Sequence, residues 1–182
     1  MTAIEWVTRE NDDVQSQFHN RLDATKIGVA GQSCGGLEAL VAAADPRVKS
    51  VAAVNTGFFP EPTNGYGREQ LANIKIPTLV VNGGPTDVAY QNSIDTFNLI
   101  NNVPAYLAEN TAAGHSGLWF GIRVNAQGNG EGNVPMANQG ATLLVNWFDF
   151  SLNNNLTAGQ YFFGSDCGLC TQPDWNVQMK NW

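Results

Sequence analysis

The segment Gly31-Gln32-Ser33-Cys34-Gly35-Gly36 constrains the fold of this chain more than any other feature. It follows the apolar run 26–30 and precedes the alanine-rich run 37–44. A G-x-S-x-G turn between a strand and a helix holds its serine in a strained backbone, with the hydroxyl exposed at the carboxyl end of a parallel sheet. A side chain at Gly31 or Gly35 is expected to collide with the neighbouring strand and helix. The segment therefore predicts a strand, a sharp turn that exposes Ser33 as a nucleophile, and a helix.

A serine is a nucleophile at neutral pH only when a base takes its proton and an acid orients that base. The chain has two histidines. His19 lies upstream of the turn in a polar helical stretch, and His115 lies downstream in the glycine-flanked loop 112–117. Because the expected order along the chain is serine, acid, histidine, His115 is the predicted base. The alternative is a loop histidine that bonds to its own backbone.

The acid is predicted from the apolar strand 76–81. This strand ends in the turn Gly83-Gly84-Pro85-Thr86-Asp87, which makes Asp87 the expected acid. Aspartate also favours turns and helix caps, so a purely structural role for Asp87 is the alternative. Glu61 is the second candidate. Three further aspartates fit less well, because they lie in helical or helix-flanking stretches: Asp45, Asp95 and Asp149.

Predicted strands and helices alternate along the chain. The strands are 26–31, 48–55, 76–82 and 104–109, and the helices are 3–20, 35–44, 68–73, 90–101 and 135–152. Such alternation is typical of right-handed βαβ units on a parallel sheet, an α/β fold. A glycine- and asparagine-rich excursion covers 125–133. Since the sequence has no internal repeat or composition boundary, residues 1–182 are predicted to form a single domain.

The composition limits the partners of the chain. Its net charge of −7 argues against nucleic acid or an anionic membrane surface. No apolar run is long enough to span a membrane, so no membrane span is expected. Only 14% of the residues are charged, and a surface rich in amides and hydroxyls is common among secreted proteins. From the opening residues 1–3, no signal peptide is expected.

Four segments together resemble a known family: the turn 31–37, the segment 83–90, the pair Gly114-His115, and the tail with Cys167-Gly168-Leu169-Cys170 before Pro173-Asp174-Trp175. They look like secreted α/β-hydrolases of fungi and bacteria, which are similar in their core to dienelactone hydrolase, chlorophyllase and cutinase-like esterases. The resemblance implies the α/β-hydrolase fold, Ser33 as nucleophile, Asp87 as acid and His115 as base. It also implies an extracellular location.

The front of the chain departs from this family. A complete α/β-hydrolase has about eight strands with the nucleophile after the fifth, whereas only a helix is predicted before residue 26. The expected fold is therefore the carboxyl-terminal half, with about four parallel strands flanked by helices. One oxyanion donor, the backbone N–H of Cys34, is retained, and the other belongs to a front loop. Loss of one such donor typically costs on the order of 100- to 1,000-fold in rate.

The same departure has a second expected consequence. The strand 26–31 is predicted to form an unpaired sheet edge, which favours self-association.

The three cysteines allow several interpretations. Cys167 and Cys170 could form a short disulfide, act as a redox pair, remain free thiols or supply half of a zinc site. A zinc site has little support, because the sequence has no second C-x-x-C and no suitably spaced histidine. Cys34 follows the nucleophile directly, and the favoured interpretation is a small buried apolar residue.

Five aromatic residues close to the predicted site bear on the substrate: Phe58, Phe59, Tyr90, Trp119 and Phe120. They are either core residues or the lining of an acyl or aryl pocket. A serine-dependent carboxylic ester hydrolase, acting through an acyl-enzyme on a hydrophobic or aromatic ester, is the predicted function. The substrate is a small molecule or a polymer, and the chemistry requires no metal or organic cofactor. The alternatives are a catalytically impaired domain of the same fold, or acyl transfer, thioester or peptide hydrolysis on the same scaffold.

Overall fold

The structure is a computed structural model and describes residues 2–124 and 130–182. Its main sheet has five strands in the order β1-β2-β3-β4-β7. Their bounds are β1 Ile27–Gln32, β2 Val48–Val54, β3 Thr78–Asn82, β4 Ala105–Asn110 and β7 Trp175–Lys180. Strands β1 to β4 are all parallel to one another, and β7 runs antiparallel to β4.

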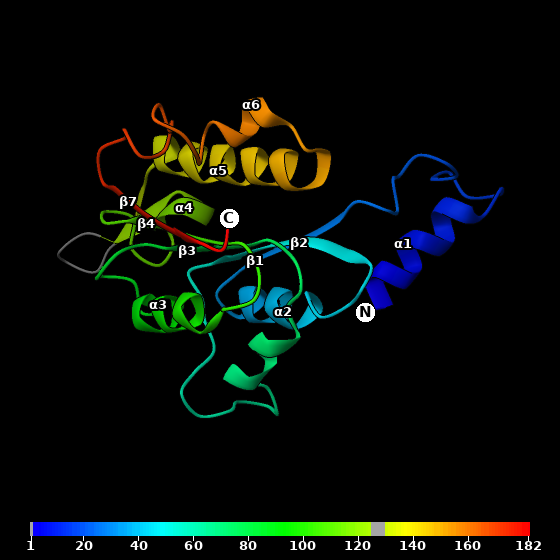
Figure 1. Cartoon of the computed structure of the whole chain (residues 1–182), viewed down its shortest axis with the longest axis horizontal. Helices are drawn as coiled ribbons and strands as arrows, with labels where there is room; N and C mark the ends of the chain where they lie inside the picture. Colours follow the sequence, from blue (N-terminus) through cyan, green and yellow to red (C-terminus); the bar gives the residue numbers. More distant parts are fainter. Residues whose placement is uncertain (1, 125–129) are drawn as a thin grey trace.

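Helices cover both faces of the sheet (Figure 1). One face carries α2 Cys34–Ala42, the 3-10 helix η1 Arg68–Asn73 and α3 Tyr90–Leu99. These elements share a face because the chain steps across the sheet in one direction through crossovers of one hand. The other face carries α4 Gly117–Phe120 and α5 Val134–Asn153, and α6 Leu156–Gly159 packs against α5.

The core lies in two layers, one on each face of the sheet. Alternate residues of β2 and β3 point to opposite faces: Val54 and Val81 pack under Trp147 of α5, whereas Ala53 and Val80 pack against the α2–α3 layer. Strands buried on both faces are nearly continuous apolar runs, which is why 48–55 and 76–82 are recognisable from sequence. The α/β prediction with four parallel strands is confirmed.

The first helix is shorter than the predicted 3–20. Helix α1 covers Thr2–Asp12 and extends away from the sheet (Figure 1). The residues that follow form turns in which polar side chains bind nearby backbone N–H groups: Asp13 accepts from Gln15, and Ser16 accepts from Phe18. Such local bonds compete with the helical ladder and end the helix.

Three further strands were not predicted. Strand β7 begins at Trp175, and the short strands β5 Ile122–Val124 and β6 Gly130–Gly132 pair with each other. Part of the predicted excursion, residues 125–129, lies outside the described residues.

Strand β1 is an edge of the sheet. Among the described residues it pairs only with β2. An exposed edge offers unpaired backbone groups to another strand, so self-association through β1 stays a prediction.

Candidate active site

Ser33 lies in the turn between β1 and α2, at the carboxyl end of the parallel strands. Its backbone has φ 54° and ψ −121°, a conformation that a residue with a side chain rarely adopts. Two hydrogen bonds hold this turn: the Ser33 N–H donates to Val54 O at 3.0 Å, and the Thr56 hydroxyl donates to Ser33 O at 2.8 Å. Neighbouring strand β2 therefore supports the strained turn.

The two glycines of the turn have different roles. A Cβ at Gly31 would lie 2.1 Å from the backbone oxygen of Gly35, so no side chain fits there. A Cβ at Gly35 meets nothing within 4 Å, and the expectation of a collision at that position is wrong. The glycine that lacks room for a side chain is instead the next residue, Gly36, where a Cβ would lie 2.4 Å from the Thr56 side chain.

This difference gives a first prediction. Gly31→Ala is expected to lower the free energy of unfolding by about 1–3 kcal/mol or more, because the backbone must move to admit the methyl group. Gly35→Ala, inside α2, is expected to leave stability unchanged or raise it by about 0.5–1 kcal/mol. Urea unfolding of both variants measures the difference. Equal destabilisation by the two substitutions would contradict this description of the turn.

His115 lies between Ser33 and Asp87. Its Nε2 is 3.0 Å from Ser33 Oγ, and its Nδ1 is 2.7 Å from Asp87 Oδ1. The side chain of Asp87 is fully buried, whereas that of His115 is 28% exposed. The structure thus brings the three residues predicted as nucleophile, base and acid into one hydrogen-bonded chain.

Two backbone contacts fix the loop that carries His115. The N–H of Gly114 donates to Gly83 O at 2.9 Å, and the Gln32 side chain donates to His115 O at 2.8 Å. A Cβ at Gly83 would lie 1.8 Å from Gly114 O. The turn that holds Asp87 and the loop that holds His115 are therefore in direct backbone contact.

Asp87 is held as a carboxylate. Burial by itself raises the pKa of Asp87, but hydrogen bonds from Asn55, Ala89, Gly83 and His115 stabilise the charged form and bring the net pKa below the usual value of 3.8. The carboxylate therefore remains ionised at neutral pH, as required for a group that orients an imidazole.

The other candidate acids and the other histidine lie in different environments. Glu61 is exposed in the loop before η1. Asp45 is bound by Arg47, whose hydrogen bonds lower the pKa of that carboxyl to about 2, and Asp95 pairs with Arg68. Asp149 accepts from Asn155. His19 is hydrogen-bonded to Asn20.

Cys34 is exposed, so the expectation of a buried apolar residue is wrong. As the first residue of α2, it has a backbone N–H without an acceptor in its own helix. Its side chain lines a cavity of about 470 Å³ between α2 and the loop after β2. The turn thus places Cys34 at the surface, whereas Ser33 itself is half-buried.

The five aromatic residues separate into two groups. Phe58 and Phe59 line the cavity beside Cys34, and Tyr66, which the sequence analysis did not single out, joins them. Phe58 is also part of the core under α2 and α3.

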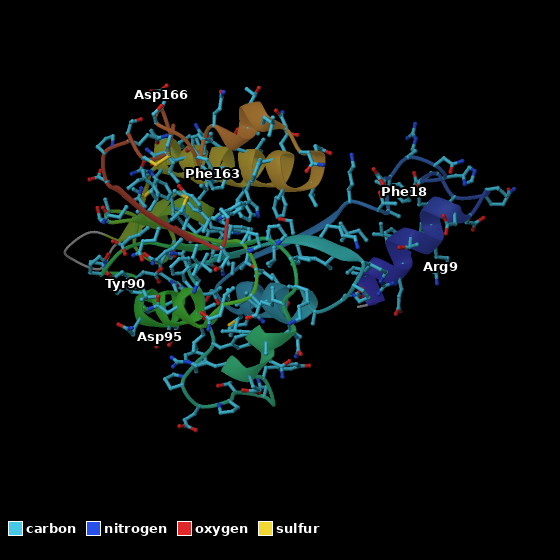
Figure 2. All side chains as sticks on the ribbon, in the orientation of Figure 1. Arg9, Phe18, Tyr90, Asp95, Phe163 and Asp166 are labelled. Carbon is cyan, nitrogen blue, oxygen red and sulfur yellow. A yellow bond between two sulfur atoms is a disulfide. The ribbon has the colours of Figure 1, made fainter. Side chains whose placement is uncertain are left out.

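The remaining three aromatics do not line this cavity. Tyr90 begins α3 (Figure 2), where the Glu109 carboxylate raises the pKa of its hydroxyl. Trp119 and Phe120 lie on the short helix α4 with 37% and 59% of their surface exposed.

The remaining cysteines form a disulfide, Cys167–Cys170. The predicted short disulfide is therefore present. No group of three or more potential metal-ligating side chains lies together within residues 2–124 and 130–182. In the same residues, no helix is long and apolar enough to cross a membrane.

Comparison with known proteins identifies the family. Residues 1–117 match the PET hydrolase-like family. Among curated proteins none matches the sequence. Similar solved structures include a protein from Klebsiella pneumoniae that is assigned as a dienelactone hydrolase, with a TM-score of 0.57 and 17% identity. The alignment covers 80% of this chain and 57% of that chain, so this chain spans little more than half of that protein's length.

The family match covers more than half of the chain, and the structural match supports the fold predicted from the strand–turn–helix segment. The chain has the α/β-hydrolase fold and belongs to the PET hydrolase-like family.

Proposed function

We propose that this chain is a serine-dependent carboxylic ester hydrolase. The observation that carries the proposal is the continuous hydrogen-bonded chain from Ser33 Oγ through His115 to buried Asp87. In this proposal His115 Nε2 accepts the proton of Ser33 as its oxygen attacks the ester carbonyl. His115 then returns that proton to the leaving alcohol, and the acyl group stays on Ser33. A water molecule, deprotonated by the same nitrogen, releases the acid and restores the serine.

The negative charge that develops on the carbonyl oxygen needs a donor. The backbone N–H of Cys34, at the amino end of α2, is the proposed oxyanion donor. The partial positive charge of that helix end favours an anion in the same place.

We propose a hydrophobic or aromatic ester as the substrate, small or polymeric. The cavity next to Cys34 has aromatic side chains from Phe58, Phe59 and Tyr66 in its lining. The name of the matched family refers to hydrolysis of PET, which is an aromatic polyester. The proposed site of action is extracellular, because the resemblance to secreted α/β-hydrolases implies that location and the amide- and hydroxyl-rich composition agrees with it.

The substrate class leads to a second prediction. Short-chain p-nitrophenyl carboxylic esters are expected to be hydrolysed much faster than peptide p-nitroanilides or p-nitrophenyl phosphate. The reason is that the described lining of the cavity offers aromatic surface but no lysine or arginine to bind a phosphate. Release of the chromophore from each substrate measures the preference. Turnover of the anilide or the phosphate at the rate of the ester would overturn the esterase proposal.

A further inference from the structure

Asn55 lies at the carboxyl end of β2, behind the proposed triad. Its side chain is fully buried, and its backbone is left-handed with φ 48°. The amide nitrogen donates to Asp87 Oδ2 at 2.6 Å and to Gly114 O at 3.2 Å. One side chain therefore connects the acid to the residue that precedes His115.

Only one orientation of this amide suits the site. If the amide were turned over, its oxygen would face a carboxylate oxygen and a carbonyl oxygen, which are both acceptors. In the observed orientation both N–H groups have acceptors, while Asn55 Oδ1 is buried without a partner among the described residues. A buried acceptor without a partner costs stability. The surroundings of Asn55 thus bind its amide nitrogen but not its amide oxygen.

We propose that Asn55 is a positioning residue of the active site, and this inference rests on the proposed function. By binding Asp87 Oδ2, it turns the other oxygen, Oδ1, toward His115 Nδ1. By binding Gly114 O, it holds the loop on which His115 stands. Asn55 exchanges no proton in the reaction: its two N–H bonds stay intact while the proton moves between Ser33 and His115 Nε2.

The first test replaces the side chain without disturbing the backbone. Asn55→Gly accepts the left-handed conformation and removes both hydrogen bonds. We expect kcat for a p-nitrophenyl ester to fall by about 10- to 100-fold, because a small displacement of reacting groups has an effect of this size. KM is expected to change little, because Asn55 lies outside the lining of the aromatic cavity.

A matched control is available in Asn154, which also has a left-handed backbone, with φ 55°, and lies exposed at the end of α5. Asn154→Gly should leave kcat unchanged. A kcat for Asn55→Gly equal to that of Asn154→Gly would overturn the proposal.

The second variant separates positioning from a merely structural role. Asn55→Asp has nearly the same shape, but at neutral pH it places a second carboxylate against Asp87. Two carboxylates in contact share a proton at lower pH, and the new carboxyl group, once protonated, could again donate to Asp87. The ratio of kcat for Asn55→Asp to kcat for the wild type is therefore expected to fall as pH rises from about 5 to about 8. A pH-independent loss, equal to that of Asn55→Gly, would indicate a structural role and contradict the proposal.

A spectroscopic readout keeps this inference separate from the proposed hydrolysis. With only two histidines in the chain, His115 can be followed by nitrogen-15 NMR, and His115→Ala assigns its signals. The wild type is expected to carry its proton on Nδ1, hydrogen-bonded to Asp87, and Asn55→Gly is expected to shift or broaden that signal. An unchanged His115 spectrum would overturn the role of Asn55. Failure of the wild type to hydrolyse any ester, with the spectrum altered as expected, would reject the proposed function alone.

Discussion

Replacement of Ser33 by alanine is expected to reduce ester hydrolysis to the background rate, a loss on the order of 10⁶-fold in kcat where the wild-type rate allows it to be measured. The reason is that Ser33 Oγ is the atom within hydrogen-bond distance of His115 Nε2, and the variant has no oxygen to form the acyl-enzyme. Initial rates with a p-nitrophenyl ester measure the loss.

Ser116 provides the control for this experiment. Ser116 directly follows His115 and precedes α4, so it is the serine nearest in sequence to the proposed base. Ser116→Ala is expected to retain hydrolysis. Retention of most of the activity in Ser33→Ala would reject Ser33 as the nucleophile.

Replacement of Asp87 by asparagine is expected to lower kcat by about 10⁴-fold. Asp87 Oδ2 accepts from both Asn55 and the Gly83 N–H, so the single oxygen of an asparagine is drawn to that position. Its NH₂ group then faces His115 Nδ1, which must become an acceptor and leave its proton on Nε2. An imidazole with the proton on Nε2 cannot accept the proton of Ser33.

Glu61→Gln is the matched control, because Glu61 is the other carboxylate considered as the acid and lies exposed in a loop. It is expected to hydrolyse esters at the wild-type rate. The rates of both variants are measured on the same ester. Equal effects of Asp87→Asn and Glu61→Gln would contradict the assignment of Asp87 as the acid.

The fold is predictable where local sequence and tertiary environment agree. Strands β2 and β3 are buried on both faces, so their sequences are apolar runs, and the turn between β1 and α2 is recognisable because its close backbone approach leaves no room for a side chain at Gly31. Helix α1 is shorter than its sequence pattern predicts, because hydrogen bonds from nearby backbone to Asp13 and Ser16 end it. The tail strand β7 escapes the sequence analysis, although Trp175, Val177 and Met179 alternate with polar residues in the pattern of a strand.

The candidate site is predictable in its residue types and only partly in its surroundings. Ser33, Asp87 and His115 each follow a strand of the parallel sheet, and the carboxyl ends of such strands meet at one edge. The cavity beside Cys34 is harder to predict from the sequence, because its lining residues come from two separate segments, α2 and the loop that carries Tyr66. Asn55 cannot be recognised from sequence, since an asparagine after a strand is an ordinary turn residue until its neighbours are known.

The central claim is that Ser33 is an activated nucleophile, and active-site labelling tests it most directly. The wild-type chain is treated with a fluorophosphonate, and the modified residue is located by peptide mass spectrometry. One phosphonyl group is expected, on Ser33, and His115→Ala should lose the label because no base remains to take the serine proton. Attachment of the label to another residue, or equal labelling of the wild type and Ser33→Ala, would contradict the claim.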